Sequence, residues 1–210
     1  MFKKILYLHI MTQQNTNIEI HPWEPYIPHN ARILILGSFP PKPNRWSMEF
    51  YYPNLINDFW RIMGLIFYNN RDQFLDNSLK RFSIDKIKNF LKEKGIAIGD
   101  SALVVNRLAD NASDKYLNII TPLPLLDTLK RIPNCQAVIS TGEKAAQIIA
   151  KQTNTIIPSI GSFTQASIHG KEIKIFRMPS TSRAYPLSIE KKAQFYKDMF
   201  SAIGILDNQY

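Results

Sequence analysis

Short apolar runs alternate along the chain with segments of helical apolar spacing. Residues 31–36 form a nearly continuous apolar run that stops at Gly37. Such a run is typical of a strand buried on both faces of a parallel sheet. We also expect strands at 96–98, 103–105, 137–140 and 171–176.

Between these runs, apolar residues recur at the spacing of one helix face. We expect helices over 58–67, 84–94, 124–129, 143–150 and 188–203. Ser83 is a suitable N-cap for the second of these helices and Gly95 a suitable stop. Residues 18–28 contain three prolines, so we expect an irregular lead-in there.

Strands that alternate with helices indicate an α/β fold. We expect three α/β/α layers around a central, mainly parallel four-stranded sheet. The chain has no internal repeat and no linker-like composition, so residues 18–210 should form one domain behind an N-terminal tail, 1–17.

In open α/β sheets, ligands bind where loops leave the carboxyl ends of the strands. Three loops should lie there, starting at Gly37, spanning 140–143 and spanning 178–185. The first is long and rich in proline, asparagine and aromatic residues, and long loops of this kind are usually functional or disordered. We therefore look for chemistry in these three loops.

The net charge of +9 favours a polyanionic partner such as nucleic acid, although a basic surface can also simply keep a protein soluble. A single cysteine, Cys135, excludes an internal disulfide and fits a reducing, cytoplasmic location, and we expect it to be buried. The four histidines are too scattered for a metal site and are interpreted as ordinary polar residues. No segment is long enough to span a bilayer, and nothing requires more than a monomer.

Aromatic residues crowd the end of the first loop, over 50–60. Aromatic rings on a loop can stack on a nucleobase that has been flipped out of a duplex. Loop packing is the alternative for Tyr51 and Tyr52, and capping of the following helix is the alternative for Asn57. Phe59 and Trp60 should anchor that helix in the core.

The third loop carries small hydroxyl residues directly after a strand, followed by Arg183. Hydroxyl groups and backbone amides in this position suit phosphate binding. A polar turn without a ligand is the alternative.

Taken in order, these pieces resemble the uracil-DNA glycosylase superfamily, and most closely its mismatch-specific and DNA-deoxyinosine (hypoxanthine) branches. The resemblance covers roughly 30–205. The segments that carry it are Gly37-Ser38-Phe39-Pro40, the loop and helix start from Phe50 to Trp60 with its Asn-Asp-Phe-Trp, Gly95 to Asp100, Thr141-Gly142, and Met178-Pro179-Ser180-Thr181-Ser182.

The resemblance implies a monofunctional DNA glycosylase of base excision repair, which hydrolyses the N-glycosidic bond of a deaminated base, uracil or hypoxanthine. It implies no cofactor and no metal. The partner would be DNA with a damaged or mismatched base. The enzyme must extrude that base, stabilise the leaving charge and place a water near the anomeric carbon.

The resemblance also implies roles for individual residues. Tyr52 would stack on the flipped base, Gly37, Ser38 and Phe39 would shape the pocket, and Thr141 would recognise the base. Pro179, Ser180, Thr181, Ser182 and Arg183 would grip the DNA backbone, and 183–185 lie where the superfamily inserts a wedge.

One position departs from the pattern of several branches. Phe39 stands where they hold a polar residue that activates water, and a phenyl ring cannot orient or deprotonate water. The deoxyinosine branch shares this feature. Asn57 is therefore our first candidate for a catalytic residue, ahead of Asn44, Asp100 and Asn118, and a structural hydrogen bond is the alternative for Asp100.

Two other functions remain open at this point. The protein could bind nucleic acid or damaged bases without cutting, which the phenylalanine at position 39 favours. It could also be a different α/β hydrolase or nucleotide-binding enzyme, although no Gly-rich phosphate loop or nucleophile elbow supports this.

Overall fold

The computed structural model describes residues 17–76, 78, 80–108 and 114–206. The expected tail, 1–17, therefore lies outside the described residues except for its last member. The Asn17 carbonyl accepts a hydrogen bond from the backbone N–H of Arg107, at 2.9 Å.

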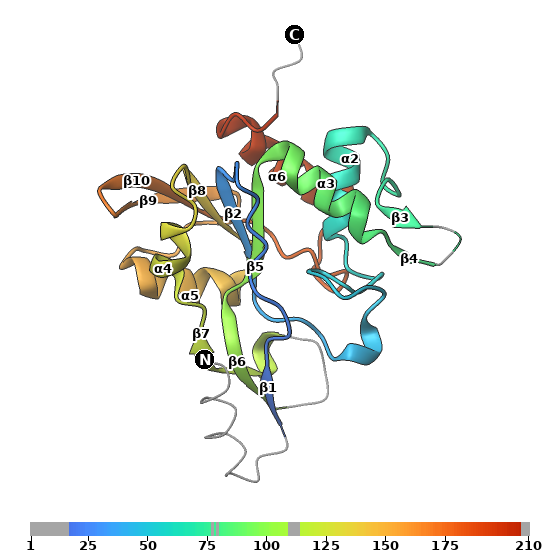
Figure 1. The fold of residues 1–210 in the computed structure, drawn as a ribbon, viewed down its shortest axis with the longest axis horizontal. Coiled ribbons are helices and arrows are strands. Elements are labelled where there is room, and N and C mark those ends of the chain that lie inside the picture. The colour runs from blue at the N-terminus through green and yellow to red at the C-terminus, as the bar shows by residue number, and fades with distance from the viewer. Residues whose placement is uncertain (1–16, 77, 79, 109–113, 207–210) are drawn as a thin grey trace.

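A mainly parallel sheet of five strands forms the centre of the molecule (Figure 1). Its order is β5 (Ile96–Asp100), β2 (Ile33–Gly37), β8 (Ala137–Ser140), β10 (Lys171–Arg177) and β9 (Ser162–Ile168). The first four strands run parallel, and β9 pairs antiparallel with β10. The expected α/β class is confirmed, whereas the expected number of four strands is wrong.

Strand β9 escaped the sequence analysis because it lies at the edge of the sheet and has no continuous apolar run. Its connection to β10 is a two-residue turn of His169 and Gly170, both with positive φ. Positive φ at both positions belongs to the type I′ turn, which suits the twist of a tight hairpin.

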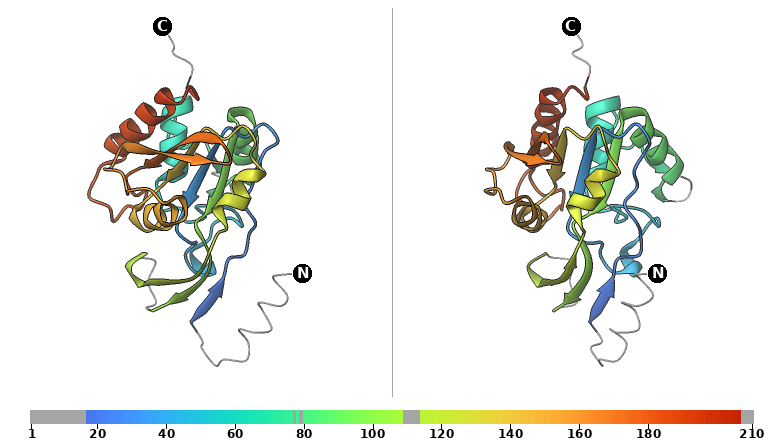
Figure 2. Two further views of the ribbon diagram at one scale, coloured as in Figure 1. Left: turned by 90° about the vertical axis from the view of Figure 1, so that its left-hand side faces the viewer. Right: turned by 60° about the vertical axis from the view of Figure 1, so that its left-hand side comes forward.

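The alternation of side chains along the strands assigns the helices to two layers, one on each face of the sheet (Figure 2). Ile33 and Ile35 of β2 pack with α2 (Phe59–Tyr68), α3 (Ile84–Lys94) and α6 (Ile189–Ala202). Leu34 and Leu36 pack with α4 (Leu125–Lys130) and α5 (Glu143–Thr153). Both faces of β2 are therefore buried, as its continuous apolar run predicted.

The helix ends follow the capping residues. The Ser83 hydroxyl accepts a hydrogen bond from the N–H of Lys86 at the start of α3, and Gly95 ends that helix at φ 65°. Ser188 caps α6 in the same way. The predictions for α3 and for the buried anchors Phe59 and Trp60, each 1% exposed, are confirmed.

A second, three-stranded sheet lies beside the central one (Figure 1). It consists of β1 (Ile18–Ile20), β6 (Ala102–Arg107) and β7 (Leu117–Pro122). Only Ser101 separates β5 from β6, so the two sheets share one continuous path of chain. The lead-in is thus partly a strand, since β1 pairs antiparallel with β6. The remaining elements are η1 (Pro43–Arg45), η2 (Asp114–Tyr116) and a small hairpin of β3 (Leu75–Asp76) and β4 (Arg81–Phe82).

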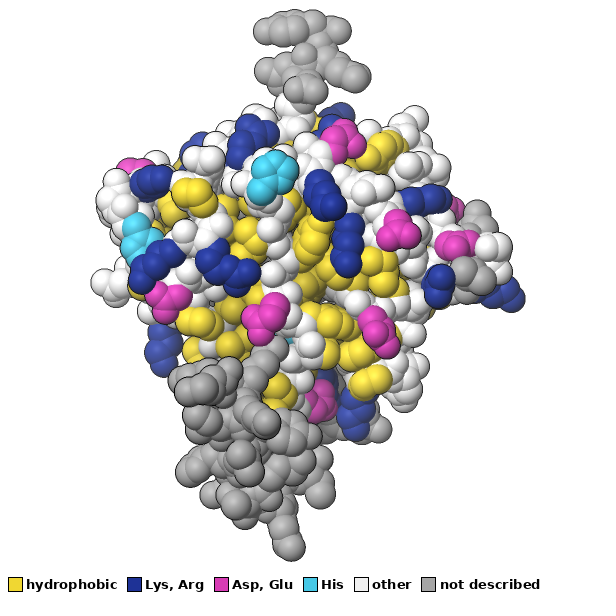
Figure 3. All heavy atoms as spheres, in the orientation of Figure 1, with side chains coloured by type: hydrophobic (Ala, Val, Ile, Leu, Met, Phe, Trp, Pro, Cys, Tyr) yellow, Lys and Arg dark blue, Asp and Glu magenta, His cyan; other side chains and the backbone are white. Residues whose placement is uncertain are grey.

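The carboxyl ends of the parallel strands form one edge. Gly37 pairs with Asp100, and Ser140 pairs with both Leu36 and Arg177. The three loops singled out in the sequence therefore leave the sheet side by side. On the face seen in Figure 3, Lys and Arg side chains are spread among acidic and apolar ones and do not gather in one patch.

Candidate functional site

Gly37, the last residue of β2, leaves no room for a side chain. A Cβ built there would overlap Oδ1 of Asp100 and lie 3.1 Å from the Tyr52 hydroxyl. Glycine at this position therefore lets Asp100 and Tyr52 approach the end of the strand together.

Tyr52 joins the first loop to the second. Its hydroxyl lies 2.7 Å from Oγ1 of Thr141, directly after β8. Burial, and then the charge of Asp100, raise the pKa of Tyr52, so its phenol stays neutral. Its backbone is left-handed at φ 53°, a conformation that costs free energy in a residue other than glycine and that occurs often at functional sites.

The Tyr52 ring lies flat against the ring of Phe59, the first residue of α2. Their centroids are 3.9 Å apart and their planes differ by 11°. Phe59 is 1% exposed and fixed in the core, whereas Tyr52 is partly exposed. One face of the Tyr52 ring is thus occupied by Phe59, and a ligand can use only the other.

Asp100 is the last residue of β5 and forms a hydrogen bond with a histidine. Its Oδ2 is 2.9 Å from Nε2 of His21, and both residues are buried. The His21 ring is stacked near Tyr51 and meets Phe39 edge-on. His21 is therefore a buried hydrogen-bond partner of Asp100, a contact that the sequence analysis did not foresee.

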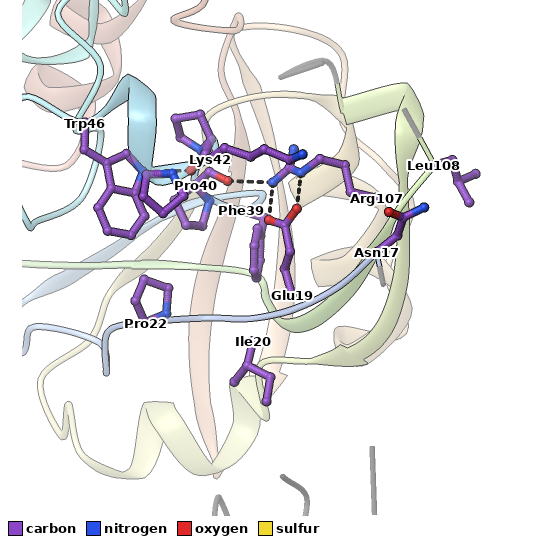
Figure 4. A pocket seen from close by; sticks show the side chains of 12 residues that line it. Asn17, Glu19, Ile20, Pro22, Phe39, Pro40, Lys42, Trp46, Arg107 and Leu108 are labelled. Carbon is purple, nitrogen blue, oxygen red and sulfur yellow. Dashed lines mark hydrogen bonds and ion pairs between the residues drawn. The ribbon is translucent and has the colours of Figure 1, made fainter. Parts of the chain in front are cut away.

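The side chain of Phe39 contacts residues outside the cluster of Gly37, Tyr52 and Thr141. Its ring contacts His21 and lies 5.9 Å from the guanidinium of Arg107. Together with Lys42 and Trp46, it lines a cavity of about 550 Å³ (Figure 4). There Arg107 donates to Oε1 of Glu19, at 2.6 Å, and to the carbonyl of Pro40. Only the backbone of Phe39 remains to shape the site at Gly37.

A second carboxyl group, which the sequence analysis missed, faces the same strand end. The Ser38 hydroxyl donates a 2.6 Å hydrogen bond to Oδ1 of Asp114. Asp114 is the first residue of η2, between β6 and β7, and is partly exposed. Burial raises the pKa of Asp114, and the Ser38 hydrogen bond opposes that rise.

Asn57 makes a hydrogen bond at the start of α2, the structural role that the sequence analysis gave as the alternative to a functional one. Its Oδ1 accepts a 2.9 Å hydrogen bond from the backbone N–H of Phe59 at the start of α2. Asn57 also forms an isolated antiparallel bridge with Ser182. It is half-buried and connects the aromatic loop to the third loop.

The third loop is fastened to the start of α2 through Asp58. The two carboxylate oxygens of Asp58 lie 3.0 Å from Nε of Arg183 and 3.1 Å from Nζ of Lys192. The backbone N–H of Asp58 donates to the carbonyl of Thr181, and Lys192 also donates to the carbonyl of Ser182. These contacts fix the loop relative to Tyr52 and Phe59.

The loop itself is shaped by its own hydroxyl groups. Ser180 and Ser182 accept hydrogen bonds from the backbone N–H groups of Ser182 and Ala184. The carbonyl of Pro179 accepts a hydrogen bond from the buried hydroxyl of Tyr196. Ser182 and Arg183 are exposed, whereas Thr181 is buried, so only part of the expected DNA grip faces solvent.

Gly142 marks the point where the loops meet. A Cβ built on it would lie 3.9 Å from both Ser180 and Oδ2 of Asp114. The expected base-binding residues Gly37, Ser38, Tyr52 and Thr141 are thus brought together, with the third loop beside them. The Phe39 ring, also in the expected set, contacts His21 and Arg107.

The remaining expectations concern the burial of Cys135, metal binding and membrane-spanning segments. Cys135 is buried, as expected, and burial raises its pKa to about 12. Within the described parts of the chain, no three His, Cys, Asp or Glu side chains are grouped so that they could hold a metal ion. Among the same residues, no helix has the length and apolar character needed to cross a membrane.

No protein-family model matches the chain, and no curated protein matches it in sequence. The chain is similar to a solution NMR structure from Methanosarcina acetivorans described as a "putative Uracil DNA glycosylase". The TM-score is 0.59 at 18% sequence identity, and the match covers 89% of this chain and 99% of that chain. The likeness shows that the two chains share a fold.

Proposed function

We propose that this protein is a monofunctional DNA glycosylase that hydrolyses the N-glycosidic bond of a deaminated base, uracil or hypoxanthine, in DNA. One observation carries the proposal. Gly37, Tyr52 and Thr141 come from three separate segments and converge at the carboxyl edge of a parallel sheet, where α/β proteins bind their ligands. The shared fold with the structure from Methanosarcina acetivorans adds support.

In this proposal the flipped base stacks on the free face of Tyr52. Phe59 backs that ring and holds it in place, so that little side-chain entropy is lost when the base arrives. Thr141 and the backbone amides of Ser38 and Phe39 provide hydrogen bonds for the edge of the base. A neutral phenol beside the base adds no negative charge where the leaving base becomes anionic.

Asn57 is proposed to orient the attacking water. Its Oδ1 already accepts one hydrogen bond, from Phe59, but a carbonyl oxygen has two lone pairs and the amide nitrogen has two N–H groups. The same bond holds Asn57 at the junction of the aromatic loop and the third loop. There it lies between the proposed base site and the proposed contact with the DNA backbone.

The loop from Pro179 to Arg183 is proposed to bind the phosphates beside the extruded nucleotide. Ser182 and Arg183 are exposed, and both lie in the segment that Asp58 and Lys192 hold against α2. Phosphate contacts of this kind position a protein on DNA and make its binding sensitive to salt. Residues 183–185 would provide the wedge that fills the gap in the duplex.

The proposal is tested by incubating the protein with labelled duplexes that carry uracil, hypoxanthine or a thymine mismatch, and then cleaving abasic sites with alkali. We expect strand breaks at uracil or hypoxanthine and none in an undamaged duplex. Tight, salt-sensitive binding without breaks on any duplex would instead favour a binding protein that does not cut. The Phe39 ring, which contacts His21 and Arg107 and carries no group that could activate a water, favours this second function.

A further inference from the structure

Asp114 lies where all three loops meet, although it belongs to none of them. Its Oδ1 accepts the hydrogen bond from Ser38 in the first loop. Its Oδ2 lies 3.9 Å from a Cβ built on Gly142 in the second loop, and Ser180 of the third loop lies at the same distance from that point. The connection between β6 and β7 thus adds a carboxyl group to the site from a fourth segment of the chain, separate from the three loops.

One oxygen of this carboxyl group remains available. Among the described residues, the Ser38 hydroxyl is the hydrogen-bond donor to Asp114, and it occupies Oδ1. Asp114 is partly exposed, and no described residue donates a hydrogen bond to its Oδ2. An ionised carboxylate offers about four lone-pair sites, and Oδ2 can therefore accept a hydrogen bond from water.

The proposed reaction needs a proton acceptor that the residues considered so far do not supply. The bond between C1′ and the base nitrogen breaks, and its electron pair leaves with the base. The oxygen of a water then forms a bond to C1′, and that water must lose a proton. An amide such as that of Asn57 can orient the water but does not accept a proton at neutral pH, and Phe39 has no acceptor at all.

We infer that Asp114 accepts this proton through Oδ2, with Ser38 fixing the orientation of its carboxylate. The proton passes from the water to Oδ2 as the C1′–O bond forms, and it later leaves to the departed base or to solvent. The inference rests on the proposed glycosylase function and adds a catalytic residue to it.

Asp100 is the competing carboxylate, and its contacts argue against this role. Its Oδ2 is occupied by Nε2 of His21, and its Oδ1 fills the space that a Cβ on Gly37 would need. Only 8% of Asp100 is exposed. Its charge instead acts on its neighbours, since it contributes to the raised pKa of both Tyr52 and Asp114.

The environment of Asp114 suits a base. Burial, with a smaller contribution from Asp100, raises the pKa of Asp114 above the ordinary 3.8, and hydrogen bonding by Ser38 together with Lys144 and Arg107 opposes that rise. A carboxylate with a raised pKa binds a proton more readily. The rate of base release should therefore rise with pH through the pKa of Asp114, at a higher pH than for an ordinary aspartate.

The test uses the full chain and the lesion duplex that the wild-type protein cleaves, under single-turnover conditions. Asp114→Asn should lower the rate of base release at least about 100-fold, because general base catalysis contributes roughly 10²- to 10⁴-fold. Its dissociation constant for the same duplex should stay within about threefold of wild type. Asp198→Asn, which changes an exposed aspartate on α6, is the matched control and should keep the wild-type rate.

Ser38→Ala provides a second readout that a purely structural role would not move. Removing the Ser38 hydroxyl removes a hydrogen bond that lowers the pKa of Asp114. The acidic limb of the pH–rate profile should therefore move to higher pH in Ser38→Ala. In Asp114→Asn that limb should disappear.

A rate for Asp114→Asn within threefold of wild type, or an acidic limb that Ser38→Ala leaves in place, would overturn the inference and leave the glycosylase function intact. If the wild-type protein releases no base from any of the three duplexes, the proposed function itself has failed. Thermal unfolding of each variant separates a folding defect from a loss of catalysis. If Asp114→Asn does not fold, the pH profile of Ser38→Ala decides.

Discussion

The rings of Tyr52 and Phe59 are stacked with their centroids 3.9 Å apart, so that a core residue of α2 supports a partly exposed residue of the aromatic loop. The loop holds Tyr52 in a left-handed backbone conformation, and the hydrogen bond to Thr141 fixes the other end of the side chain. Such a ring is set in position before a ligand arrives. This relationship connects the packing of the fold to the proposed recognition of a base.

Replacing Tyr52 by alanine should weaken binding to a lesion duplex by about 1–3 kcal/mol, because a base then loses its stacking partner. The measurement is the dissociation constant for a duplex with the excised base and for an undamaged duplex. The undamaged duplex should bind nearly as before.

Tyr52→Phe is the matched variant. It keeps the ring and loses only the hydroxyl that contacts Thr141, so it should retain most of the binding. Unchanged binding and cleavage in Tyr52→Ala would show that Tyr52 does not stack on a base.

Asn57→Ala should abolish turnover while leaving DNA binding nearly unchanged. It should also lower the free energy of unfolding by about 1 kcal/mol, since the N–H of Phe59 loses its acceptor. Single-turnover rates and thermal unfolding measure the two effects separately.

Asn57→Asp separates the two roles, because aspartate keeps an oxygen for the Phe59 N–H but has no amide N–H groups. Its stability should approach that of wild type, and its turnover should stay low. Full activity in Asn57→Ala would remove Asn57 from the proposed mechanism.

Lys192→Met should destabilise the protein by about 3 kcal/mol, because it leaves the buried carboxylate of Asp58 with only the half-exposed Arg183 as a partner. It should also release the carbonyl of Ser182 and loosen the third loop. Denaturant unfolding measures the first effect, and the affinity for DNA measures the second.

Lys197→Met alters an exposed lysine on the same helix and should change stability by less than about 0.5 kcal/mol. Equal stability in the two variants would mean that the Asp58–Lys192 pair does not hold the loop.

Gly37→Ala should lower the rate of base release more than it disturbs the surrounding fold. The added Cβ must displace the carboxylate of Asp100 or the hydroxyl of Tyr52. Gly204→Ala is the control, because a Cβ there meets no atom within 4 Å and only its φ of 62° is unfavourable. Base release should fall in Gly37→Ala and not in Gly204→Ala; wild-type rates in both would contradict the close packing at the end of β2.

The parallel sheet and its helices were predictable because each element carries its pattern of apolar and capping residues within its own short stretch of sequence. Both faces of β2 are buried, so its residues are continuously apolar, and α3 carries both its N-cap Ser83 and its C-terminal Gly95. The edge strand β9 was not predictable in this way, since one of its sides faces solvent and its sequence is largely polar. Strand β1 was hidden by the prolines that follow it and pairs only with the distant β6.

The candidate site likewise contains some residues that the sequence identified and others that it did not. Gly37, Tyr52 and Thr141 follow strands or precede a helix, and the sequence identified them together. Asp114 follows no strand of the central sheet, and only the folding of β6 and β7 brings it to Ser38. The role of His21 was missed because a buried hydrogen bond with Asp100, 79 positions away, leaves no trace in local spacing.

The most direct test of the central claim is to identify the free base that the protein releases from DNA. The wild-type protein is incubated with duplexes that contain uracil, hypoxanthine or a thymine mismatch, and the small-molecule fraction is analysed by mass spectrometry. We expect free uracil or free hypoxanthine from the matching duplex, at a rate that falls to background in Asn57→Ala. Release of no base from any duplex, with binding retained, would contradict the assignment of a glycosylase.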